Sequence, residues 1–566
     1  MEMATISTKY TDLISRLISP TRIEKTTLLL ITSFLFLFSW LCLFSQKIPI
    51  NNGIGWDGLE YARIVKLFPH YLHAFDQYRS HRVFPSFIVA LGLRAFGLAN
   101  SDENIIYGFE MLNFVAVLFA VSLWWCFVVR LRINMTWRLI SFSGLFLNFP
   151  ILTLASYNPV LTDTVAFALG IAIFYFYYIQ KPSCVFLFGL LGCFTFPLFN
   201  ILTFLLVLFP YQEKKFIHTC VSSSLEKNKF NLLALGVAAG LVMIATMYLS
   251  ILILPTSFLW PIILHAMPSY ATFALNSFAA NIVHITPNYV PSFCFLANLT
   301  NLGFPLLTAS MLILFAYVYL GLKYIFTDSF LSAIKCIGKH VSFRSLAMSM
   351  ALILINIGVL SLLSNDVKGA LTPLSFFLVL LTEFSSLPFI NLVDAFIQYG
   401  PFVFFIILFW RRICTQAYNM SLGCVLSLAL FRLFSLSSEG RQYINFIGML
   451  VFIVLIVVSD SGFKQLPMRV PLLLMGLSLL FSKFWFHITM PSIPPISGVE
   501  ILSPIWQDYY MNYGPWMSPS RYLLQFIVIG FSLAILRFFL SKMSPEASTY
   551  NSGYVSHTSS REMLFE

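Results

Sequence analysis

TTLLLITSFLFLFSWLCLFS, residues 26–45, is a run of apolar and hydroxyl-bearing side chains that contains no charge. As an α-helix it would be about 30 Å long, which matches the thickness of the hydrocarbon core of a bilayer. A charged stretch that ends at Lys25 precedes the run, and no small-residue cleavage site follows it. We therefore expect an uncleaved first membrane span rather than a signal peptide.

Similar apolar runs recur along the whole chain. Of its 566 residues only 10% are charged and 60 are phenylalanine, and the mean hydropathy is +0.84. Soluble domains carry about 25% charged residues, so this composition predicts an all-α polytopic membrane protein. The nine cysteines contain no CxxC pair, and we expect buried apolar thiols rather than a metal site or a disulfide framework.

The apolar runs predict about 12–14 transmembrane helices in a single domain, residues 26–540. A cytosolic segment 1–25 precedes this domain, and a polar, disordered cytosolic tail 541–566 follows it. The two short runs in 183–211 could also form one long broken helix. The predicted spans are 26–45, 106–129, 138–157, 160–180, 183–196, 198–211, 231–253, 302–322, 345–363, 391–410, 417–435, 444–459, 471–488 and 522–540.

Basic residues orient these spans. The net charge is +11, but the Lys and Arg residues lie in short loops and form no single patch, which argues against nucleic-acid binding. Neither the loop 254–301 nor most of the loop 489–521 carries Lys or Arg, so both loops are assigned to the non-cytosolic face. Both termini are then cytosolic, and the apolar stretches 83–99 and 371–390 must either lie along the outer face or dip into it as re-entrant segments. The first outer loop, 46–105, accordingly holds juxtamembrane helices.

The polar motifs all fall on the outer face in this topology. Five separated polar, aromatic loops on one face indicate one binding site rather than five unrelated turns. The motifs are GWDGLEY (55–61), YRSHRVFP (78–85), NPVLTD (158–163), SSEGRQY (437–443) and WQDYYMNYGPW (506–516).

Asp57 is the candidate catalytic base. A carboxylate between two glycines can approach a substrate closely and accept a proton from a hydroxyl group. The alternative is that Asp57 only caps a helix that begins near Gly58, and capping also accounts for much of the Thr162–Asp163 pair.

Arginines are the candidate ligands of a phosphate, which they bind in a bidentate manner. Arg79 and Arg82 are three residues apart and would project to one side of a helical turn, while Arg441 could face a phosphate or pair with Glu439. Snorkelling of the arginines to lipid headgroups is the alternative for the first pair. Tyr509 and Trp516 could stack on a sugar or belong to an interfacial aromatic belt. The candidate substrate-binding residues are Trp56, Tyr61, Asp163, Glu439, Tyr509 and Trp516.

The order of these motifs resembles the polytopic GT-C glycosyltransferases, a superfamily that includes bacterial members and mannosyltransferases of the endoplasmic reticulum. The resemblance covers mainly the first 210 residues and SSEGRQY. It implies an inverting transfer of a sugar from a polyprenyl-phosphate donor on the non-cytosolic face, with Asp57 as general base. By the same resemblance Arg79, Arg82 and Arg441 would bind the donor phosphate. The sequence departs from many relatives at Gly58, where no second acidic residue follows, and at the hairpin tip CFTFPLFN, which has no basic residue.

We therefore expect a hexosyltransferase that needs neither a metal nor another cofactor. Its partners would be membrane lipids, the lipid-linked sugar donor and a glycan, lipid or protein acceptor. Its membrane would be a bacterial inner membrane or the endoplasmic reticulum. A transporter or flippase of lipid-linked sugars would use the same outer surface without chemistry, and a membrane scaffold would use it only for stability.

Overall fold

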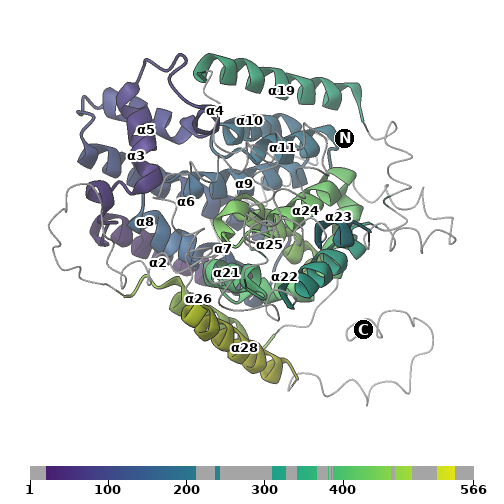
Figure 1. The fold of residues 1–566 in the computed structure, drawn as a ribbon. Helices are drawn as coiled ribbons and strands as arrows, with labels where there is room; N and C mark the ends of the chain where they lie inside the picture. Colours follow the sequence, from purple (N-terminus) through teal and green to yellow (C-terminus); the bar gives the residue numbers. More distant parts are fainter. Residues whose placement is uncertain are drawn as a thin grey trace, which may run out of the picture.

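The computed structural model describes residues 21–211, 236–242, 309–326, 341–365, 387–460, 466–486 and 519–541, with residues 330, 380 and 384. This part of the chain is helical and contains no strand, although Phe75 and Ser364 form an isolated β-bridge. Figure 1 shows the helices gathered into one bundle, with α19 along one edge and α26 and α28 along the opposite edge. The helices are α2 (Arg22–Phe44), η1 (Ile50–Gly53), α3 (Trp56–Leu67), α4 (Gln77–Ser80), α5 (Val83–Ala95), α6 (Asp102–Arg130), α7 (Met135–Phe146), η2 (Pro150–Leu154), α8 (Ala155–Tyr157), α9 (Asp163–Tyr178), α10 (Pro182–Cys193), α11 (Phe199–Leu208), α19 (Phe343–Leu363), α21 (Ile390–Tyr399), α22 (Phe402–Leu408), α23 (Trp410–Met420), α24 (Leu422–Phe434), η4 (Gly440–Tyr443), α25 (Ile444–Asp460), α26 (Arg469–Ser482) and α28 (Pro519–Ser541).

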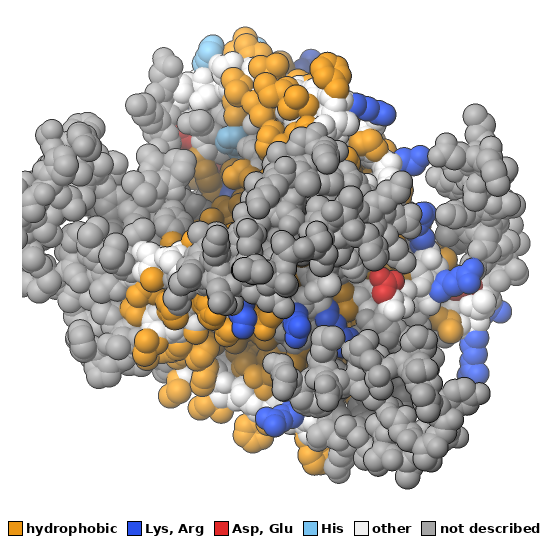
Figure 2. Space-filling model, turned by 90° about the vertical axis from the view of Figure 1, so that its right-hand side faces the viewer, with side chains coloured by type: hydrophobic (Ala, Val, Ile, Leu, Met, Phe, Trp, Pro, Cys, Tyr) orange, Lys and Arg blue, Asp and Glu red, His pale blue; other side chains and the backbone are white. Residues whose placement is uncertain are grey.

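The helices have the character of a membrane protein. Within the described residues four helices are long and apolar enough to cross a bilayer, and a bent pair, Met135–Phe146 with Pro150–Tyr157, makes a fifth. The outer side of α19 is strongly exposed and apolar, with Phe343, Leu354 and Ile357 more than half accessible. Figure 2 shows apolar side chains over much of the described part of one face, with Lys and Arg in separate groups among them. Because water would penalise such a surface, it indicates contact with lipid.

Three of the predicted spans are divided in the structure, and one of them is 138–157, which bends by 48° between Met135–Phe146 and Pro150–Tyr157. The stretch 391–410 is not one helix, because α21 ends before Gly400 and α22 begins after Pro401. Gly400 has φ of 65°, a left-handed conformation that ends a helix, and Pro401 cannot continue the hydrogen-bond ladder. The predicted span 417–435 is likewise interrupted, since α23 ends at Met420 and α24 begins at Leu422. The predicted total of 12–14 spans stays a prediction.

The stretch 183–211 forms two helices that fold back on each other, and the alternative of one long broken helix is wrong. A Cβ atom at Gly189 of α10 would overlap the Thr203 side chain of α11. A Cβ at Gly192 would lie 2.7 Å from the ring of Phe199. The two glycines therefore allow the short helices to pack closely.

The stretch 83–99 contains α5, which is too short to cross a bilayer. Its 13 residues span about 20 Å, against a hydrocarbon core of about 30 Å. It packs against α3 and α6 and, together with α3 and α4, forms the helical part of the first loop. This length agrees with the prediction of a juxtamembrane helix. Most of 371–390, the second stretch assigned to the outer face, and the tail 542–566 lie outside the described residues.

The core is the contact between α9 and α25, which lie side by side at the centre of the bundle (Figure 1). Gly170 faces the backbone of Asn445, where an added Cβ atom would clash. A Cβ atom added at Gly448 would lie 2.5 Å from Ile171 Cγ1. Further along, the rings of Phe174 and Phe452 are in contact. The pairing advances in the same direction on both helices, so α9 and α25 run parallel, as the charge-based topology requires.

We expect Gly170→Ala to destabilise the protein by about 1–3 kcal/mol, because the new methyl group would push α25 away from α9. The matched control is Gly358→Ala on α19, where nothing lies within 4 Å of the added Cβ. That change should be neutral or stabilise by up to about 1 kcal/mol. Thermal unfolding of both variants in detergent tests this, and equal midpoints for the two would contradict it.

Candidate functional site

Two of the polar motifs fit against each other through glycines. Gly55 has φ of 79°, and a Cβ there would lie 2.8 Å from the side-chain oxygen of Asn158. A Cβ at Gly58 would lie 3.1 Å from Val160 Cβ and 3.2 Å from Val160 O. The glycines therefore let GWDG lie directly on NPV, and this contact fixes Asp57 between them.

Asp57 is not the N-cap residue of its helix, so the alternative that it only caps the helix is wrong. Helix α3 begins at Trp56, two residues earlier than expected, and Gly55 is the N-cap residue without a side-chain hydrogen bond. Asp57 lies in the first turn, where a carboxylate interacts favourably with the helix dipole. Its side chain is 46% exposed, which leaves it accessible to a substrate.

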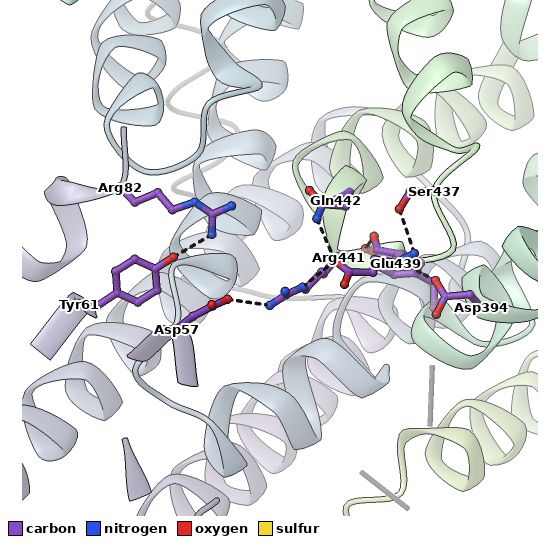
Figure 3. Close-up of polar contacts among 10 residues, drawn as sticks. Asp57, Tyr61, Arg82, Asp394, Ser437, Glu439, Arg441 and Gln442 are labelled. Carbon is purple, nitrogen blue, oxygen red and sulfur yellow. Dashed lines mark hydrogen bonds and ion pairs between the residues drawn. The ribbon is translucent and has the colours of Figure 1, made fainter. Parts of the chain in front are cut away.

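Arg441 reaches Asp57 from the other end of the chain. Its Nη1 lies 3.5 Å from Asp57 Oδ2, and its Nε donates to Glu439 Oε2 at 3.2 Å. Gln442 donates to the same Glu439 oxygen at 2.9 Å. Figure 3 shows Asp57 and Arg441 pointing toward each other from separate elements. Glu439 therefore holds the arginine, and both of the roles that the sequence allowed for Arg441 remain compatible with its position.

Asp163 is buried within range of the charges of this pair. Asp163 is 4% exposed, and its Oδ2 has no hydrogen-bond partner among the described residues. Thr162, the N-cap residue of α9, makes no capping hydrogen bond, so capping does not account for this pair. The charges that act on Asp163 are those of Arg441, Arg82, Asp57 and Glu439. The four candidate motifs that the structure describes thus contribute to one cluster.

Arg82 is a buried cation that contacts no carboxylate among the described residues. Its guanidinium lies between the rings of Tyr78 and Phe196, 4.7 and 4.8 Å from their centroids. It donates to the Tyr61 hydroxyl at 2.8 Å, while its Nε has no partner within the described structure (Figure 3). Burial raises the pKa of Tyr61, so this phenol stays neutral, and the carboxylates whose charges act on Arg82 are Asp163 and Asp57.

Phe196 comes from the hairpin tip CFTFPLFN, the segment without a basic residue. The tip reaches the site nevertheless, because Phe84 N–H donates to Phe194 O at 2.8 Å beside the Arg82 contact. Its contribution is an aromatic wall for Arg82 instead of a charge of its own.

Arg79 has different partners from Arg82. It pairs with Asp76, and its Nη2 lies 3.5 Å from Glu60 Oε1. With 39% of its side chain exposed, it lies at the surface of the first loop, and both of its partners are carboxylates. The side chain of Trp56 and the whole motif with Tyr509 and Trp516 lie outside the described residues.

Sequence reasoning missed Asn113, which supports the site from α6. This residue is 1% exposed, and its amide donates to Ala155 O at 3.2 Å and to Pro159 O at 3.0 Å. It thereby holds the turn between η2 and α9, where the chain has no regular hydrogen bonds. The available signal was a lone amide within a long apolar run, since such a group needs a partner inside the membrane.

No protein-family model matches the chain, and neither a curated protein nor a solved structure is similar to it. The function therefore has to be argued from the geometry of the site. That geometry combines an accessible carboxylate, a buried carboxylate and two arginines, all within a helical membrane protein.

These groups suit an anionic substrate that also carries a hydroxyl group. Arg82 and the N-terminus of α9 supply positive potential, and the aromatic rings around Arg82 exclude water from it. Asp57 can accept a proton from a hydroxyl, and the Arg441 guanidinium lies beside this carboxylate.

Asn113→Leu should lower the free energy of unfolding by about 1–3 kcal/mol, because it leaves two buried carbonyl groups without a donor. The control on the same helix is Ser122→Ala, whose hydroxyl bonds only to Leu118 O of its own helix and should matter by less than about 0.5 kcal/mol. Thermal unfolding in detergent measures both changes. If the two variants were equally stable, Asn113 would not hold the turn.

Proposed function

We propose that this protein is an integral-membrane glycosyltransferase. It would move a sugar from a polyprenyl-phosphate donor to a hydroxyl acceptor at the non-cytosolic face, with inversion and without a metal. One observation carries the proposal: Asp57, Asp163, Arg82 and Arg441, from four separate polar motifs, gather in one cluster although up to 384 residues separate them. Turns that served only to connect helices would not require these charged side chains to lie close together.

The proposed reaction assigns one task to each group. The acceptor oxygen attacks the anomeric carbon while Asp57 takes the hydroxyl proton. The bond between that carbon and the phosphate oxygen breaks, and the phosphate departs with the electron pair. Attack from the face opposite the leaving group inverts the anomeric centre.

Arg82 and Arg441 would stabilise the charge that develops on the leaving phosphate. Preorganised cations are most effective where water is excluded, which is the situation of Arg82 between two aromatic rings. Tyr61 and Glu439 would hold the two guanidinium groups in place, and Asp163 would contact the sugar.

We expect Asp57→Asn to fold and insert normally but to reduce the transfer rate by about 100- to 10,000-fold, because an amide cannot accept the proton. The control is Asp102→Asn, another exposed carboxylate beside the first loop, which pairs with Lys66 at 2.6 Å. It should retain wild-type activity. The assay uses purified protein in nanodiscs with a panel of short-chain polyprenyl-phosphate hexoses and glycan or alcohol acceptors, and follows both the new glycosidic bond and the released lipid phosphate.

Two results would count against the enzyme. Wild-type activity in Asp57→Asn would remove Asp57 from the role of base. Movement of the labelled donor between the leaflets of proteoliposomes, with no glycosidic bond formed by the wild-type protein, would favour a transporter.

The two arginines of the first loop provide a second, matched comparison. Arg82→Lys should raise the donor KM by about tenfold or more, since lysine cannot make the bidentate contact or keep the ring stacking. Arg79→Lys should change it by less than about twofold, because Arg79 is paired with carboxylates at the surface. Titration of the donor at saturating acceptor distinguishes the two, and equal KM values would exclude Arg82 as the phosphate ligand.

A further inference from the structure

Helix α21 presents three polar side chains to the segment that carries Arg441. Asn391, Asp394 and Gln398 are spaced by three and four residues and therefore lie on one face of the helix. All three are at most 2% exposed, and Asp394 is completely buried. A buried carboxylate is costly unless hydrogen bonds compensate it, so its partners indicate what it does.

Those partners lie in the turn between α24 and α25. Asp394 Oδ2 accepts the backbone N–H of Gly440, the residue directly before Arg441. The hydroxyl of Tyr399 donates to Gly440 O at 2.8 Å. One turn earlier, Asn391 Nδ2 donates to Ser435 O at 2.9 Å. Both backbone groups of Gly440 are therefore held by α21.

The contact also explains why a glycine precedes Arg441. A Cβ at Gly440 would lie 2.7 Å from Asp394 Oδ2 and 2.7 Å from Gln398 Cγ. Only a residue without a side chain lets the turn come this close to α21. The turn is thus held at Gly440 by hydrogen bonds to both of its backbone groups, directly before Arg441.

We propose that Asp394 is a positioning residue, which holds Gly440 so that the Arg441 guanidinium reaches Asp57. The proposal rests on the proposed function in assigning Arg441 to the donor phosphate. It assigns a role to an acid that touches neither the substrate nor the reacting atoms. Hydrogen bonds from α21 replace the regular helix ladder at this turn, so removal of the carboxylate frees the turn to shift.

The first test measures the turn itself and needs no activity. In hydrogen–deuterium exchange of the full-length protein in nanodiscs, Asp394→Leu should accelerate exchange in residues 435–443, because Gly440 N–H loses its acceptor. Exchange in α9 should stay at the wild-type level. Asp394→Asn keeps an oxygen that can accept this hydrogen bond and should restore protection. Unchanged exchange in Asp394→Leu overturns the proposal.

The second test measures the consequence for catalysis. Asp394→Leu should raise the donor KM and lower kcat, so that kcat/KM for the donor falls by about 100-fold, while the acceptor KM stays unchanged. A misplacement of about 1 Å has effects of this size. Asp394→Asn should lie within about fivefold of wild type. The double variant Asp394→Leu/Arg441→Ala should be no worse than Arg441→Ala alone, because both changes remove the same contact. Fully additive losses would overturn the proposal.

A third variant guards against misfolding of Asp394→Leu. Gly440→Ala keeps the carboxylate but forces the turn away from α21, so it should reproduce both the faster exchange and the higher donor KM. Wild-type exchange together with wild-type kinetics in Gly440→Ala would overturn the proposal. If exchange responds as expected while the wild-type protein transfers no sugar, the positioning by Asp394 is supported and the proposed function fails.

Discussion

The close parallel contact of α9 and α25 is the constraint on which the candidate site depends. Gly170 and Gly448 remove the side chains that would keep the two helices apart, so each backbone lies against the other helix. Asp163 is the first residue of α9, and Arg441 lies just before α25, so parallel packing brings the two charges to the same end. An antiparallel arrangement would place them at opposite ends of the bundle.

The charges at this end differ in how they are compensated. Arg79 is neutralised by Asp76 and Glu60 at the surface, whereas Arg82 is enclosed by rings and a neutral phenol. The carboxylates that act on Arg82, Asp163 and Asp57, make no ion pair with it in the described part of the chain, and burial of a cation without a contacting counter-ion costs stability. This contrast separates arginines that support the fold from those suited to a ligand, and spacing along the sequence could not have made the distinction.

Helical spans and polar motifs were predictable because they depend on local chemistry. Lipid leaves the backbone no alternative to a helix, so the long apolar runs appear as α2, α6 and α19 close to their predicted bounds. The predicted helix boundaries were wrong where an apolar run is divided into short helices. The break at Gly400–Pro401 was missed although glycine and proline are local signals for it, while the choice between a hairpin and one broken helix over 183–211 depends on the packing of α10 on α11. Asp57 and Asp163 stay candidates that the sequence could supply, whereas the role proposed for Asp394 required knowledge of what lies beside α21.

By itself the sequence determined that this is a helical membrane protein whose polar residues are concentrated in a few turns, since hydropathy and charge act along the chain. Tertiary structure decided which of those turns meet. Asp57 and Arg441 are joined through the fit of GWDG on NPV and through the hold of α21 on Gly440, contacts between residues that are far apart in sequence. Such contacts arise from shape complementarity and the need to pair buried polar groups, and both become defined only once the helices have packed.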